Sequence, residues 1–148
     1  MKQLFWCYFR SHYHPLVISQ VKESENVNDF KEMVQPFYQI LNKYLLIQGI
    51  SKRQIPSASG IDRRTVYKIY HDPDYTPTKR LVLCLGLGLR LERELFDSFL
   101  HDCGYHLSEH FARDVVIAYC IKERIYELTQ VNIYLEKVGE SPLGGCVF

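Results

Sequence analysis

The chain lacks most of the features that mark a secreted, membrane-spanning or metal-binding protein. Its five cysteines lie far apart and none forms a Cys-x-x-Cys pair; they are Cys7, Cys84, Cys103, Cys120 and Cys146. An odd number with this spacing offers no disulfide framework and favours reduced thiols in a cytoplasmic protein. The apolar run near the N-terminus has six residues before Arg10, which is too short for a signal peptide or a membrane span. We therefore expect a cytoplasmic protein that does not enter a membrane.

The chain also lacks a strong excess of charge, because its formal net charge is only +1. The charges are nevertheless unevenly distributed. Residues 51–80 hold seven Lys or Arg against three Asp, a local net charge of +4, and residues 81–148 hold six Lys or Arg against ten acidic residues, a net of −4. A basic segment of this kind can attract a nucleic acid, although an excess of this size also falls within ordinary patchiness.

Motifs for catalysis, nucleotide binding and metal binding are missing too. Gly86-Leu87-Gly88 has no third glycine and no Lys-Ser/Thr after it, so it is not a phosphate-binding loop. Four potential zinc ligands gather in one segment, namely His101, Cys103, His106 and His110. A helix break expected at Leu107-Ser108 prevents the last two from sharing one helix face. We therefore expect no enzymatic activity, no metal and no cofactor.

What the sequence does contain is a helix-turn-helix pattern between Gly49 and Ile69. Ser51, with Gln54 three residues later, forms a capping box that opens a short helix. Gly60 supplies the turn, and Asp62 caps a second helix that begins with two arginines. In this arrangement the second helix of the pair can enter the major groove of DNA.

Helix caps and apolar faces predict an all-α fold, with five helices between Pro36 and about Asp102. The first begins after Pro36 and ends at Gly49, with Phe37, Leu41, Tyr44 and Leu45 on one face. The second and third form the helix-turn-helix, Thr78 caps the fourth, and the fifth ends near Gly104. The leucines of residues 81–91 alternate as in a strand, but the small and apolar residues between them favour a buried helix.

Two further helices are expected after Ser108. Ser108 itself caps the first, which has Phe111, Val115, Ala118 and Tyr119 on one face, and the second contains Ile125, Leu128, Asn132 and Leu135. This pattern divides the chain into an N-terminal arm and linker (1–29), a helix-turn-helix domain (30–103) and a C-terminal helical extension (104–148).

The segment from Gly49 to Leu100 resembles the Xre/Cro-repressor helix-turn-helix family. Ile50-Ser51 and Ile55 stand where the family has Leu-Ser and a buried Leu, and Gly60-Ile61 stands at its Gly-Val turn. Val66 and Ile69 match its buried positions after the turn, and Pro77-Thr78 matches the Pro-Ser before its fourth helix.

The wider run to Gly145 is similar to a group of small bacterial helical proteins, through four short motifs. They are Ile61-Asp62-Arg63, Asp74-Tyr75-Thr76-Pro77, Gly104-Tyr105-His106-Leu107-Ser108 and Leu143-Gly144. Similar modules also occur fused to macro domains, which leaves open an accessory role, as an antitoxin or a defence-associated protein.

The resemblance implies a sequence-specific DNA-binding transcriptional regulator. Arg63, Arg64 and Lys68 would face base edges of double-stranded DNA, with Thr65 and Tyr67 toward its backbone. Lys52 and Arg53 would meet phosphates at the start of the preceding helix. Repressor-type domains usually bind as dimers, so we expect a homodimer, with the C-terminal helices as its interface or as a surface for a protein partner.

Two features favour the alternative, a protein-interaction module that keeps the helix-turn-helix shape without binding DNA. Pro56 stands where the family usually has a small Ala, so the first helix of the pair should be short or distorted and start near Ser57. Acidic residues also lie near the basic helix, namely Asp62, Asp72 and Asp74. A DNA reader needs the basic residues exposed and free of ion pairs with these acids.

The aromatic side chains near the N-terminus form an apolar surface that must be buried somewhere; they are Phe5, Trp6, Tyr8 and Phe9. We expect them to pack against the C-terminal helices or a partner subunit, which leaves the second helix of the pair open. If they covered Arg63 to Lys68 instead, the interaction module would be favoured.

Overall fold

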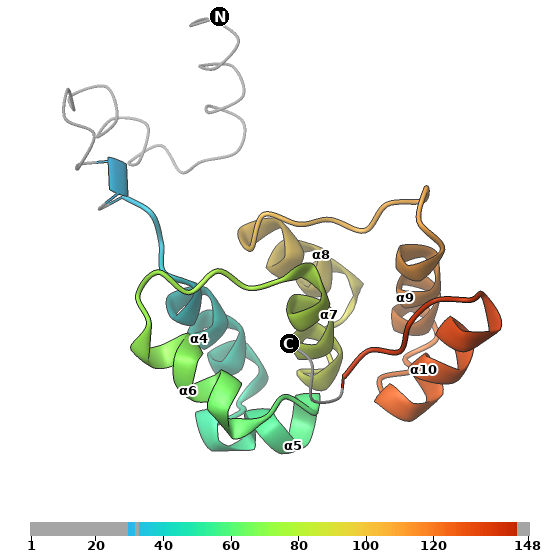
Figure 1. The fold of residues 1–148 in the computed structure, drawn as a ribbon, viewed down its shortest axis with the longest axis horizontal. Helices are drawn as coiled ribbons and strands as arrows, with labels where there is room; N and C mark the ends of the chain where they lie inside the picture. The colour runs from blue at the N-terminus through green and yellow to red at the C-terminus, as the bar shows by residue number, and fades with distance from the viewer. Residues whose placement is uncertain (1–29, 32, 145–148) are drawn as a thin grey trace, which may run out of the picture. The chain divides into compact units, whose positions relative to one another are not determined.

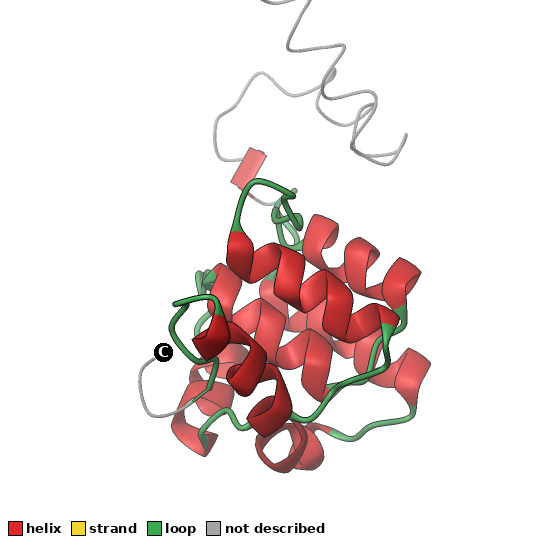
Figure 2. Ribbon diagram, turned by 90° about the vertical axis from the view of Figure 1, so that its right-hand side faces the viewer, coloured by secondary structure: helices red, strands yellow, loops and turns green. Residues whose placement is uncertain are grey.

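The computed structural model describes residues 30–31 and 33–144, and its regular structure is helical throughout (Figure 1). Seven α-helices and one 3₁₀ turn lie between Phe37 and Lys137, and the described residues contain no strand (Figure 2). The predicted all-α fold is therefore confirmed. No helix among the described residues is long and apolar enough to cross a membrane.

The first helix of the core, α4 (Phe37–Gln48), begins directly after Pro36, as predicted. Gly49 ends it in the left-handed conformation (φ +65°), and its N–H donates to the carbonyls of Leu45 and Leu46. The helix buries one side, made of Phe37, Ile40, Leu41, Tyr44 and Leu45. A residue with a Cβ would be strained at Gly49, which is why glycine is favoured at this helix end.

The helix-turn-helix consists of a 3₁₀ turn η1 (Lys52–Gln54), α5 (Ile55–Ser59) and α6 (Arg63–His71). Pro56 lies in the first turn of α5, where a missing N–H removes no hydrogen bond within the helix. Helix α5 is short, as expected, but it starts at Ile55 rather than near Ser57. The prediction of the later start was wrong because the 3₁₀ turn leads directly into a helix that tolerates proline near its start.

Helix α7 (Lys79–Gly88) lies in the middle of the described helices and contacts α5, α8 and α10 (Figure 1). Its residues from Leu81 to Leu87 are all buried, so the alternating leucines belong to a core helix and not to a strand. The glycines allow close packing. A Cβ at Gly88 would lie 2.6 Å from the backbone of α5, and one at Gly86 would lie 2.5 Å from the ring of Phe96.

Three helices complete the fold, namely α8 (Arg93–Asp102), α9 (Ala112–Lys122) and α10 (Leu128–Lys137). Their buried side chains, among them Phe96, Ile117 and Val131, join the same core as those of α4 and α7. The two C-terminal helices thus pack on the helices that support the helix-turn-helix.

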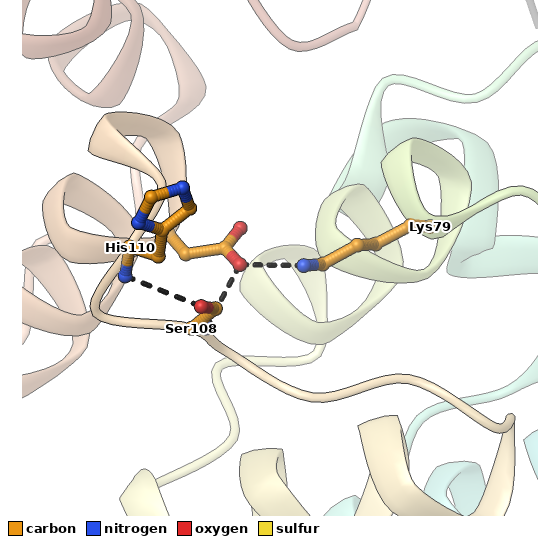
Figure 3. A network of polar contacts seen from close by, with 4 residues as sticks. Lys79, Ser108 and His110 are labelled. Atoms are coloured by element: carbon orange, nitrogen blue, oxygen red, sulfur yellow. Dashed lines mark hydrogen bonds and ion pairs between the residues drawn. The ribbon is translucent and has the colours of Figure 1, made fainter.

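The start of α9 differs from the prediction. Ser108 does not cap the helix, which begins at Ala112 after Phe111. The backbone N–H of Ser108 instead donates to the Asp114 carboxylate at 2.9 Å, and Lys79 of α7 lies 2.5 Å from the same oxygen (Figure 3). The bond to Asp114 ties the Ser108 backbone to the first turn of α9. The Ser108 hydroxyl accepts a hydrogen bond from the His110 N–H.

The apolar side chains predicted to share one face of α9 point away from the core. Phe111, Val115 and Tyr119 are 59%, 48% and 47% exposed, and Ala118 is half-buried. The helix buries Ile117 and Cys120 instead. We call the exposed side chains of Phe111, Val115 and Tyr119 the apolar face of α9.

Candidate nucleic-acid interface

Helix α6 presents most of the residues predicted to contact DNA. Four of these predicted residues have exposed side chains, and their helical spacing places them on one side of the helix: Arg63, Arg64, Tyr67 and Lys68. We call this set the basic face of α6. The opposite side buries Val66 and Ile69 in the core, which fixes how the helix is turned.

Asp62, the acidic residue next to the basic face in the sequence, is the N-cap of α6. Asp62 accepts hydrogen bonds from the backbone N–H of Thr65 at 2.9 Å and from its hydroxyl at 2.7 Å. These bonds, first the hydroxyl and then the backbone N–H, lower the pKa of Asp62 below its ordinary value. The carboxylate is thus held by its own helix and forms no ion pair with an arginine of the basic face.

The other two acidic residues of the region also leave the basic face unpaired. The Asp72 carboxylate accepts from the backbone N–H of Asp74 at 3.0 Å, within the loop that follows α6. Among the described residues, Arg63, Arg64 and Lys68 form no ion pair with an acidic side chain. The exposed, unpaired state that a DNA reader needs is therefore present in this part of the chain.

Thr65 is the predicted residue that contributes least to this interface. It is half-buried, and its hydroxyl is engaged by Asp62. Its function in the structure is that of a partner in the helix cap, which stabilises the first turn of α6.

The Tyr67 side chain is 62% exposed, but its ring has a neighbour that restricts its orientation. Its ring stacks on the imidazole of His71, with centroids 3.8 Å apart and an angle of 12° between the planes. His71 was not predicted as part of the site, although its i, i+4 spacing from Tyr67 places the two rings on one helix face. This stacking holds the tyrosine at a defined position on the basic face of α6.

The start of the helix-turn-helix adds two exposed cations beside the basic face. Lys52 and Arg53 lie in η1, and the Lys52 ammonium lies 3.7 Å from the centroid of the Tyr70 ring. An open cleft separates η1 and α5 from α6, and its lining consists of Lys52, Arg53, Pro56, Arg63, Val66 and Tyr67. Positive charge therefore surrounds an apolar depression in the candidate interface.

The histidines and the cysteine between residues 101 and 110 do not come together as a metal site. Within residues 30–31 and 33–144, no three His, Cys, Asp or Glu side chains are placed to share one ion. Burial, followed by the nearby Asp102 charge, raises the pKa of Cys103 to about 12, so this thiol stays protonated at neutral pH. A zinc ion bound here would have to displace that proton, because zinc binds the thiolate.

Phe5, Trp6, Tyr8 and Phe9, which we expect to pack on the C-terminal helices, lie outside the described residues. Comparison of the chain with protein-family models, curated proteins and solved structures gives no match. The resemblance to the Xre/Cro family accordingly remains a prediction from the sequence motifs.

Proposed function

We propose that this protein is a sequence-specific DNA-binding transcriptional regulator of bacterial, cytoplasmic type. The observation that carries the proposal is the basic face of α6. Its cations are exposed on one side of a helix that follows a tight turn, and none is paired with an acid among the described residues. An arginine in this state can donate to an external acceptor without first losing an internal partner.

Each part of the interface has a separate task in this proposal. Arg63 and Arg64 donate to O6 and N7 of guanine in the major groove, because the planar guanidinium matches these two acceptors. Lys52 and Arg53 lie on the neighbouring turn and contact phosphates, which sets the orientation of the protein without reading sequence. The Asp62 cap holds the first turn of α6, where both arginines are located.

Selection from a random-sequence duplex library tests this function directly. We expect the protein to enrich a defined sequence that contains guanine, with an affinity that falls as the salt concentration rises. A protein that retains no duplex, or one that retains all duplexes equally at every salt concentration, would contradict sequence-specific binding.

We further propose that two copies associate through the apolar face of α9. An antiparallel pair about a twofold axis would place Val115 against its own copy and Phe111 against Tyr119 of the second copy. The same arrangement brings Glu109, at one end of the face, toward Lys122 at the other. Both are exposed, and neither forms an ion pair with another described residue. Light scattering after size-exclusion chromatography tests this association.

The second candidate function is a protein-interaction or accessory module, such as an antitoxin or a defence-associated protein. The same apolar face of α9 favours it, since three large exposed apolar side chains on one helix suit a protein partner. This function requires no DNA binding. A protein that binds no duplex in the selection, and stays monomeric by light scattering with this face intact, would favour the second candidate.

A further inference from the structure

We propose that the cleft between η1, α5 and α6 receives the 5-methyl group of a thymine that neighbours the guanine contacted by Arg63. This inference rests on the proposed function, because it names the base that the DNA interface recognises beside guanine. The observation that carries it is a pair of apolar side chains in the cleft. The proposed contacts of arginine and lysine with DNA would leave these side chains without a partner.

Two apolar residues line the cleft, Val66 and Pro56, and we call this pair its apolar floor. Val66 is 6% exposed and belongs to the core, so it cannot move toward a ligand or away from one. Pro56 is half-buried at the start of α5, and its ring is rigid. An apolar group that enters the cleft therefore meets a fixed apolar surface, and its contact requires little ordering of side chains.

Pro56 gains a specific role in this arrangement. The resemblance places a small Ala at this position, and the proline ring adds apolar surface to the cleft at no loss of a helix hydrogen bond. Pro56, which departs from the family pattern, would therefore contact the thymine methyl group in the cleft.

Tyr67 of α6 also lines the cleft. Its stacking on His71 restricts the ring, and its 62% exposure leaves much of its surface for contact. Arg63 lines the same cleft one turn earlier in α6. A group that touches the Tyr67 ring would accordingly lie beside the group that Arg63 contacts.

The chemistry of the surroundings selects thymine. Lys52, Arg53 and Arg63 place positive charge around the apolar floor, so the ligand must combine an apolar group with nearby anionic or acceptor atoms. In the major groove of DNA, the thymine methyl is the apolar group that base edges present, and phosphates and base acceptors lie close to it. An A·T pair next to a G·C pair meets both requirements.

The experiment uses the duplex selected from the random library, with each thymine replaced in turn by uracil, which lacks only the methyl group. We expect uracil at one position beside a guanine to weaken binding roughly fourfold, as loss of one buried methyl predicts. Affinity that is equal for thymine and uracil at every position would overturn the inference while leaving the proposed function in place.

Variants locate the methyl contact. Tyr67→Ala and Pro56→Ala should reduce the thymine preference to less than about twofold, whereas Tyr67→Phe, which keeps the ring, should retain it. Lys68→Ala is the matched control, because it removes a cation of the basic face that does not line the cleft. It should weaken binding and keep the full preference for thymine.

The remaining outcomes are also decisive. A thymine preference that persists in both Tyr67→Ala and Pro56→Ala would place the methyl elsewhere and overturn the inference. Failure of the wild-type protein to enrich any sequence would overturn the proposed function together with the inference. Specific binding with a thymine-independent affinity would overturn only the inference.

Discussion

Two helices of this protein carry exposed faces of opposite character, and each depends on an aspartate in a different way. The basic face of α6 follows Asp62, an exposed residue whose carboxylate accepts two hydrogen bonds from Thr65, three positions later. The apolar face of α9 lies on a helix whose first turn contains Asp114, a residue that is 3% exposed and paired with Lys79 of α7. The first aspartate stabilises its own helix, and the second fixes a helix relative to the core.

This difference predicts that the two faces respond differently to substitution. The α6 cap is local, so its loss should disturb the DNA interface more than the fold. The Asp114 contacts connect α7, the loop before α9 and α9 itself, so their loss should weaken the whole unit (Figure 3). Single substitutions of the two aspartates separate these effects.

The largest effect is expected for Asp114→Ala. The substitution leaves the Lys79 ammonium and the Ser108 N–H without their acceptor, in a region that is largely shielded from water. Because the Lys79 side chain is 31% exposed and can be partly hydrated, we expect a loss of about 2–3 kcal/mol in the free energy of unfolding. Urea denaturation measures this loss.

Asp97→Ala is the matched control for Asp114→Ala. Asp97 also forms an ion pair, with Arg93 at 2.7 Å, but both side chains are about half exposed. Such surface pairs contribute little, so we expect a change below about 0.5 kcal/mol. Equal losses for the two substitutions would show that the buried position of Asp114 does not matter.

The next largest effect is expected on the affinity for DNA. Arg63→Ala and Arg64→Ala should each cost about 1–3 kcal/mol on the selected site, since each removes a contact to a base edge. Lys52→Ala should instead weaken binding to all sequences alike and flatten the dependence of affinity on salt. Mobility-shift titrations at two salt concentrations separate the two patterns.

Equal losses for all three substitutions on every sequence would argue against base recognition by α6. Unfolding measurements on the two arginine variants provide the control, because Arg63 and Arg64 are exposed and form no ion pair among the described residues. We expect changes within about 0.5 kcal/mol of the wild-type free energy of unfolding.

The apolar face of α9 should determine self-association. Val115→Glu places two carboxylates at the proposed twofold axis and should raise the dimer dissociation constant at least about tenfold, without loss of helix content. Leu46→Glu is the matched control, since Leu46 is 83% exposed on α4, away from this face. Analytical ultracentrifugation over a range of concentrations measures both, and an unchanged dissociation constant for Val115→Glu would exclude this face as the interface.

Local sequence signals sufficed for the helix-turn-helix but not for α9. The Gly49 and Gly60 turns and the Asp62 cap each depend on residues within one helical turn, so the sequence reveals them. Helix α9 has apolar residues on all sides, and its periodicity does not say which side is buried. That choice is made by Asp114, whose partner Lys79 lies 35 positions away in the chain.

The candidate site also combines local features with one that depends on residues far apart in the chain. The cations of α6 follow from their position after the turn. The cleft, in contrast, requires η1 and α5 to lie beside α6, and close packing of α5 on α7 at Gly88 places them there. Sequence spacing within α6 carries no information on this second wall.

The smallest effect is expected for the cap of α6. Asp62→Ala removes the acceptor of both Thr65 bonds and should cost about 1 kcal/mol in the free energy of unfolding, whereas Asp62→Asn should retain most of the cap.

Because the pKa of Asp62 is lowered in the folded protein, the charged cap stabilises the fold above the ordinary carboxyl pKa of about 3.9. That contribution should disappear as the pH falls through the lowered value. Since Asp62 is exposed and screened by solvent, we expect a difference well below 1 kcal/mol between wild type and Asp62→Asn in this pH range. Urea denaturation between about pH 6 and pH 2 measures it. A gap between the two proteins that widens as the pH falls would contradict the assignment of Asp62 as a charged cap.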